Sequence, residues 1–253
     1  MKKALGIFAT IIVAGGLVFY LFYDGSQGLV YDSEQPTEVV NNTPPPSPST
    51  GEDEEIDLPA RVLLDVPFFA QAPTANWSDP RQQDGCEEAS MLMAHLWLTD
   101  DTMTVQQAEQ EIIDVSEYQK TKYGEYIDRS LPDTAKLFEE YYKHSDYEVK
   151  RKVTAEDIKK ELAQGHLVIV PTNGQILNNP NYTGEGPLTH MLPIIGYDEA
   201  KKEFITNDPG TRNGRQFRFT YQNMMDSIYE YETGTHEGYT KTDTVMMVVK
   251  KSS

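Results

Sequence analysis

Cysteine is almost absent from this chain, which has one, Cys86, in 253 residues. A single cysteine rules out an intramolecular disulfide and a multi-cysteine zinc site. Basic residues are also scarce, with 22 Lys and Arg against 40 Asp and Glu and a formal net charge of -18. Because nucleic-acid affinity comes largely from Lys and Arg on phosphates, nucleic acid is excluded as a partner. The same acidity makes the polar part of the chain unsuited to an anionic lipid surface.

Charge of either sign is missing from Ala4 to Tyr23. Twenty helical residues, at about 1.5 Å each, cross the hydrocarbon core of a bilayer. Residues 1–23 are therefore predicted to be an N-terminal membrane anchor. A cleaved signal peptide is the alternative, although its apolar core is typically shorter. Lys2 and Lys3 precede the run and acidic residues follow it, so the positive-inside rule predicts a single-pass protein with its C-terminal domain outside the cytoplasmic membrane.

Lys and Arg are absent from residues 24–60, which contain a proline-rich stretch (44–48) and an acidic run (52–55). Such a segment buries too little apolar surface to order itself, so it is predicted to be a disordered acidic, Pro-rich linker. The remaining residues, 61–253, are predicted to form one domain.

Hydrophobic periodicity predicts helices before strands within this domain. We expect four helices. The first covers 86–98, the second begins at a capping box of Thr104 and Gln107, the third covers 134–142, and the fourth runs from Thr154 to Gly165. We expect strands over 61–69, 166–170, 190–197, 203–206, 216–220 and 244–249. This order favours an α+β fold in which a helical N-terminal part packs on an antiparallel sheet.

Three residues of this pattern suit nucleophilic catalysis. Cys86 lies where a loop becomes a helix, and the positive end of a helix favours a thiolate. His190 begins one predicted strand and Asp208 follows the next, so a hairpin would place both at the same end. An acid that orients an imidazole, which in turn activates a thiol, is the arrangement of a catalytic triad. The other histidines show no metal-like spacing, and neither a metal nor another cofactor is expected.

Four segments resemble the C39-like branch of the papain-like cysteine peptidases. They are Asp65-Val66-Pro67-Phe68-Phe69-Ala70-Gln71, Asp84-Gly85-Cys86-Glu87-Glu88-Ala89-Ser90, Thr189-His190-Met191-Leu192-Pro193-Ile194-Ile195-Gly196-Tyr197-Asp198 and Asn207-Asp208-Pro209-Gly210. The resemblance implies a papain-like fold in which Cys86 is the nucleophile, His190 the general base and acid, and Asp208 the orienting acid. It also implies that Gln71 supplies the oxyanion hole, for which Gln82 and Gln83, nearer to Cys86 in sequence, are alternatives.

The resemblance implies a hydrolase that cleaves peptide bonds through a Cys86 acyl-enzyme, with a peptide or protein as substrate. Two alternatives use the same residues differently: a cell-wall amidase or acyl transferase, and a catalytically inactive binding module. The second draws on Glu87, because many relatives have glycine after the nucleophile. Glu87 and Glu88 would oppose ionisation of a neighbouring thiol. Trp77, in the loop before Cys86, is a candidate for a substrate cleft, a lid or the core.

Overall fold

The computed structural model describes residues 58–234 and 242–251. The expected anchor (1–23) and nearly all of the expected linker (24–60) lie outside the described residues. Within the described ranges, no helix combines the length and the apolar character that crossing a bilayer requires.

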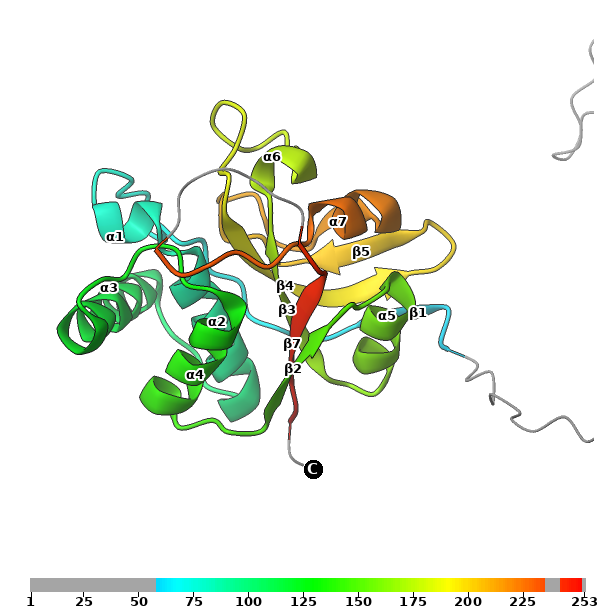
Figure 1. Cartoon of the computed structure of the whole chain (residues 1–253), viewed down its shortest axis with the longest axis horizontal. Helices are drawn as coiled ribbons and strands as arrows, with labels where there is room; N and C mark the ends of the chain where they lie inside the picture. The colour runs from blue at the N-terminus through cyan, green and yellow to red at the C-terminus, as the bar shows by residue number, and fades with distance from the viewer. Residues whose placement is uncertain (1–57, 235–241, 252–253) are drawn as a thin grey trace, which may run out of the picture. The chain divides into compact units, whose positions relative to one another are not determined.

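The described chain forms an α+β fold built on an antiparallel sheet of seven strands, as the sequence predicts (Figure 1). The main path runs in the order β2-β7-β3-β4-β5-β6, and β1 pairs with β4 beside it. The strands are β1 (Arg61–Leu63), β2 (Tyr147–Arg151), β3 (Leu167–Thr172), β4 (His190–Asp198), β5 (Glu203–Thr206), β6 (Phe217–Thr220) and β7 (Val245–Val249). Every pairing of these strands is antiparallel.

Seven helices accompany the sheet in the described ranges. They are α1 (Pro80–Gln83), α2 (Cys86–Thr99), α3 (Val105–Tyr123), α4 (Leu131–Tyr142), α5 (Ala155–Ala163), α6 (Gly174–Leu177) and α7 (Tyr221–Ser227). The capping box of Thr104 and Gln107 begins α3, and Thr154 caps α5 with Asp157 as its partner. Both helices thus begin where the sequence predicts, because each cap satisfies backbone N–H groups that a helix start leaves open.

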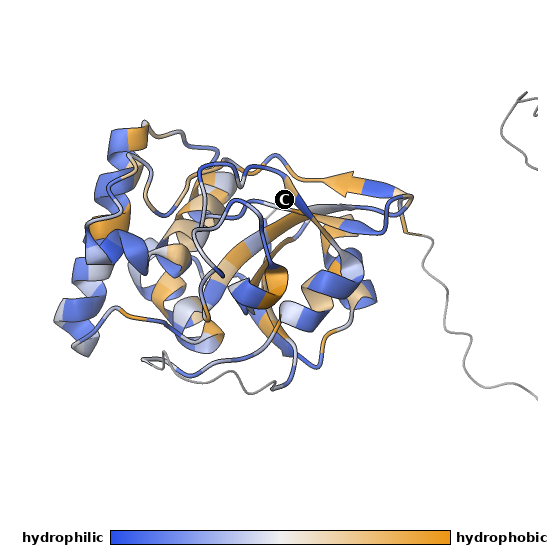
Figure 2. Cartoon of the chain, turned by 90° about the horizontal axis from the view of Figure 1, so that it is seen from above, coloured by the Kyte–Doolittle hydropathy of each residue, from blue (hydrophilic) through white to orange (hydrophobic). Residues whose placement is uncertain are grey.

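Both faces of the sheet are buried, because alternate residues of its central strands point to opposite sides. On one face, Leu167 and Ile169 of β3 join a core with side chains of α2 and α4. On the other, Val168 and Val170 join a core with side chains of α5 and α7. Figure 2 shows the central strands largely orange, whereas the helices carry blue and orange residues. The prediction of a helical N-terminal part on the sheet holds for α2 and α4 but omitted the second helical layer.

Two predicted boundaries are wrong, and one strand was not predicted. The first strand ends at Leu63 rather than at residue 69, and after it the Leu64 N–H still donates to the Ile195 carbonyl of β4 at 2.8 Å. The third predicted helix begins at Leu131 rather than at residue 134, because Ser130 caps it. The sequence did not predict β2, whose residues alternate with charges at Glu148 and Lys150.

Candidate active site

Helix α2 places Cys86 against the start of β4. The helix packs on β4, and the Ser90 hydroxyl donates to the Met191 carbonyl at 3.2 Å, one residue after His190. Gly85 is the N-cap. A Cβ at Gly85 would lie 2.8 Å from the Arg81 carbonyl oxygen, so only glycine lets α1 and α2 approach this closely. Cys86 follows this N-cap directly and is the first residue of the 14-residue helix α2.

The hairpin of β4 and β5 brings His190 and Asp208 to the same end of the sheet, as the sequence predicts. Nε2 of His190 lies 2.8 Å from Oδ1 of Asp208, and both side chains are buried. Because a carboxylate can only accept, Nε2 carries the proton of the neutral imidazole. The other ring nitrogen, Nδ1, is then the acceptor.

Asp208 is held ionised by several donors. The Tyr182 hydroxyl and the Asn179 amide donate to Oδ2 at 2.7 and 2.8 Å, and the Gly210 N–H donates to Oδ1 at 2.9 Å. Complete burial opposes ionisation, but the His190 imidazole and these hydrogen bonds outweigh it and lower the pKa of Asp208. The contact with Gly210 is an Asx turn, so Asp208 both shapes the turn and orients the histidine.

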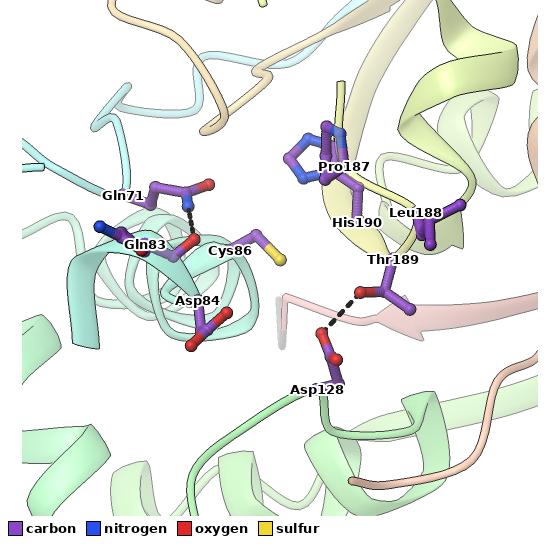
Figure 3. Close-up of a pocket in the computed structure, with 9 residues that line it drawn as sticks. All are labelled: Gln71, Gln83, Asp84, Cys86, Asp128, Pro187, Leu188, Thr189 and His190. Atoms are coloured by element: carbon purple, nitrogen blue, oxygen red, sulfur yellow. Dashed lines mark hydrogen bonds between the residues drawn. The ribbon is translucent and has the colours of Figure 1, made fainter. Parts of the chain in front are cut away.

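Cys86 and His190 line one pocket of about 220 Å³. Figure 3 shows the Cys86 sulfur and the His190 ring facing this space from α2 and from β4. The other described lining residues are Gln71, Gln83, Asp84, Asp128, Pro187, Leu188 and Thr189. The structure therefore brings together all four predicted site residues, Cys86, His190, Asp208 and Gln71, with Asp208 behind the histidine.

The thiol of Cys86 is buried and donates to Oε2 of Glu87 at 3.0 Å. Burial is the largest cause that raises the pKa of the Cys86 thiol well above its ordinary value. The Glu87 carboxylate is the next, and Asp128 and Glu88 add to it. The start of a helix favours a thiolate, as the sequence suggests. In this structure burial and the neighbouring acids dominate, and the cysteine is held as the neutral thiol.

A backbone hydrogen bond holds Gln71 beside the pocket. Its N–H donates to the carbonyl of Pro209, the residue after Asp208, at 2.9 Å. Its Nε2 donates to the carbonyls of Gln82 and Gln83 at 3.0 and 2.6 Å. Both amide hydrogens are thus used on backbone oxygens. Of the two alternatives, Gln83 lines the pocket, whereas Gln82 turns its amide to Glu109.

A wider groove of about 650 Å³ adjoins the pocket and shares Gln71, Gln83 and Pro187 with it. Trp77 and Tyr182 contribute aromatic walls to this groove, and Trp77 is 40% exposed. Of the substrate cleft, the lid and the core, the three places considered for Trp77, its position in the wall of this groove agrees with the cleft.

Sequence reasoning missed the two donors to Asp208 and the partner of Glu87. Tyr182 and Asn179 lie in a loop far from Asp208 in sequence, and Tyr231 donates to Oε1 of Glu87 from the other end of the domain. No local pattern distinguishes these residues from other loop residues. Among the described residues, no cluster of three or more His, Cys, Asp or Glu side chains could hold a metal ion.

A comparison of sequences identifies the family of this chain. The chain is similar to a C39-like peptidase from Bacillus anthracis (16% identity, 76% of this chain and 99% of that chain, TM-score 0.46). It is also similar to xylellain, a cysteine protease from Xylella fastidiosa (14% identity, 78% and 87% covered, TM-score 0.39). No curated protein matches. The sequence model described as "Peptidase_C39 like family" matches residues 63–239, and this chain belongs to that family.

Proposed function

We propose that this protein is a cysteine peptidase that hydrolyses peptide bonds through an acyl-enzyme on Cys86. One observation carries the proposal: the His190–Asp208 pair and the Cys86 thiol meet at a single pocket. That pocket opens beside a groove with room for an extended peptide. A nucleophile, a base and an oriented acid in this relation are the requirements of thiol-based acyl transfer.

The chemistry follows from the hydrogen bonds. Nδ1 of His190 takes the proton of the Cys86 thiol, and the thiolate forms a C–S bond to the scissile carbonyl. The Cys86 N–H, at the first residue of a helix, has no acceptor within the helix and would bind the oxyanion. Gln71 would add a second donor by turning its amide away from the Gln82 and Gln83 carbonyls.

Collapse of the tetrahedral intermediate breaks the C–N bond. The imidazolium of His190 returns its proton to the leaving amine, which leaves a thioester on Cys86. His190 then takes a proton from water as the water attacks the thioester. The carboxylic acid departs, and Cys86 recovers its proton. Asp208 stays ionised throughout and stabilises the imidazolium.

A second candidate, the inactive binding module, draws support from the buried thiol bonded to Glu87 and from the occupied amide of Gln71. In that case the pocket and its adjoining groove would hold a peptide without cleaving it.

The test is to incubate the full-length protein with a mixed peptide library and to search for new termini by mass spectrometry. Cys86→Ala and His190→Ala variants serve as controls for contaminating peptidases. Cleavage that both substitutions abolish is expected. Retention of uncleaved peptides by the unaltered protein would favour the binding module. Cleavage that persists in Cys86→Ala would overturn the proposed nucleophile.

The site of action is a further part of the proposal, and residues 1–60 alone support it. An apolar run preceded by two lysines and followed by an acidic linker would hold the peptidase outside the cytoplasmic membrane. A protease added to intact cells should then digest the domain, whereas a domain that stays protected until lysis would exclude this orientation.

A further inference from the structure

A buried carboxylate occupies the position next to the proposed nucleophile. Glu87 is 2% exposed, and each of its two oxygens accepts a side-chain hydrogen bond. Oε2 accepts the Sγ–H of Cys86 at 3.0 Å, and Oε1 accepts the Tyr231 hydroxyl at 2.7 Å. Tyr231 is itself buried, and its hydroxyl holds the carboxylate oxygen that the thiol does not contact.

This arrangement stabilises the thiol and not the thiolate. A thiol can donate to a carboxylate, but a thiolate beside a carboxylate places two negative charges together where little solvent screens them. While the thiol proton faces Glu87, it is also not available to Nδ1 of His190. The same contact therefore opposes both formation of the nucleophile and its alignment.

We propose that Glu87 is a positioning residue that holds Cys86 as a neutral thiol in the resting enzyme, with Tyr231 as its anchor. This inference rests on the proposed function, because it assigns regulation to the same site. The nucleophile forms when the Sγ–H turns from Glu87 to His190 and passes its proton to Nδ1. Glu87 remains bonded to Tyr231 during this step.

Protonation of Glu87 releases the thiol in a second way. Burial is the main cause that raises the pKa of Glu87, so the carboxyl gains a proton at a higher pH than an exposed glutamate does. Other titratable groups face the pair from every packed element. They are Glu88 of α2, Asp84 after α1, Asp128 of the loop before α4, Tyr182 of the loop before β4, His190 of β4 and Tyr231. Glu87 differs from them in bonding the sulfur directly.

The chain offers a direct test, because a label on its one cysteine reports only Cys86. The full-length protein and its Glu87→Gln, Glu88→Gln, Tyr231→Phe and His190→Ala variants are treated with iodoacetamide from pH 5 to 9. Intact mass gives the rate of alkylation, and circular dichroism verifies the fold. Glu88→Gln is the matched control, since it replaces a buried carboxyl group one residue away that bonds Gln119 and not the thiol.

Glu87→Gln should be alkylated about tenfold faster than the unaltered protein at pH 7, with its profile moved to lower pH, since one pKa unit changes the thiolate fraction tenfold. Glu88→Gln should stay within about twofold. A rate for Glu87→Gln at or below that of the unaltered protein across the range would overturn the inference. If Glu87→Gln does not fold, Tyr231→Phe decides: faster alkylation supports the inference, and an unchanged rate overturns it.

The His190→Ala variant separates this inference from the proposed function. If His190→Ala alters the profile and Glu87→Gln does not, the cysteine–histidine couple stands and the role of Glu87 fails. If Glu87→Gln accelerates alkylation and His190→Ala changes nothing at any pH, Glu87 restrains the thiol but the catalytic couple fails.

Discussion

At the scale of single residues, the site contains two buried acids, Asp208 and Glu87, that differ in the hydrogen-bond donors around them. Asp208 has no exposed surface, yet four donors keep it ionised. Glu87 is nearly as buried but accepts from two weakly acidic groups, a thiol and a phenol. Burial alone therefore does not decide the charge of either group. The strength and number of the donors around it do.

Asp208→Asn should reduce peptide cleavage by about 10²- to 10⁴-fold. The amide can donate to Nε2 and would then move the imidazole proton to Nδ1, the nitrogen that must accept the thiol proton. With the amide nitrogen in the place of Oδ1, the carbonyl oxygen in the place of Oδ2 still accepts from Tyr182 and Asn179, whereas the Gly210 N–H loses its acceptor.

The measurement is kcat with a cleavable peptide, with thermal unfolding to show that the domain is intact. Tyr182→Phe is the control, since it removes one donor without changing the acceptor, and it should lower kcat by only a few-fold. Equal kcat for Asp208→Asn and the unaltered protein would show that Asp208 does not orient the base.

At the scale of elements, β1 depends on one glycine of β4. A Cβ at Gly196 would lie 2.2 Å from the Val62 carbonyl oxygen, which is closer than any real contact. Only the absence of a side chain lets β1 pair with residues 196–198 of β4, on the edge that β3 covers over residues 190–194, while β5 pairs along the other edge.

Gly196→Ala should therefore displace β1 and destabilise the domain by about 1–3 kcal/mol. Hydrogen exchange should rise over 61–64 while α2 and the β4–β5 end with His190 keep their protection. Leu63→Ala is the control, because the Leu63 side chain is 39% exposed and its removal leaves the pairing in place. Unchanged exchange over 61–64 in Gly196→Ala would contradict this role.

The elements that could be predicted from sequence are those with strong local signals. The caps at Thr104 and Thr154 and the apolar run of β3 are such signals, and they gave elements close to the observed bounds. The four-residue helices α1 and α6 are too short for any periodicity, and the charges of β2 hide its pairing with β7.

The same distinction applies to the site. A cysteine at a helix start and a His–Asp pair across a hairpin follow from local pattern, so these three residues were predictable. The contacts of Asn179, Tyr182 and Tyr231 depend on how distant loops pack. Periodicity carries no information on such packing, so the groups that set the charge of Asp208 and Glu87 could not be read from the sequence.

At the scale of the whole molecule, a few of the many acidic side chains are buried, and these make the free energy of unfolding depend on pH. Burial raises the pKa of Glu87 and, more strongly, of Glu88. Between the ordinary glutamate value of 4.5 and the raised value, the folded state keeps a proton that the unfolded state has released. Stability therefore falls as pH rises through this window. Asp208 acts in the opposite direction. Its lowered pKa stabilises the folded state above the ordinary value of 3.8, and this contribution is lost as pH falls below that value.

Glu88→Gln should stabilise the protein at pH 8 by about 1 kcal/mol, or roughly 2–4 °C in Tm. Oε1 of Glu88 accepts from Gln119, and a glutamine oxygen can keep that bond. Oε2 is buried and has no hydrogen-bond partner among the described residues, so glutamine removes the cost of ionising an oxygen that none of these residues stabilises. At about pH 3.5, below the ordinary glutamate value of 4.5, the carboxyl is protonated in the folded and the unfolded state alike, so the gain should vanish. Differential scanning calorimetry at both pH values measures the difference, and an equal shift at about pH 3.5 and at pH 8 would mean that packing and not charge accounts for it.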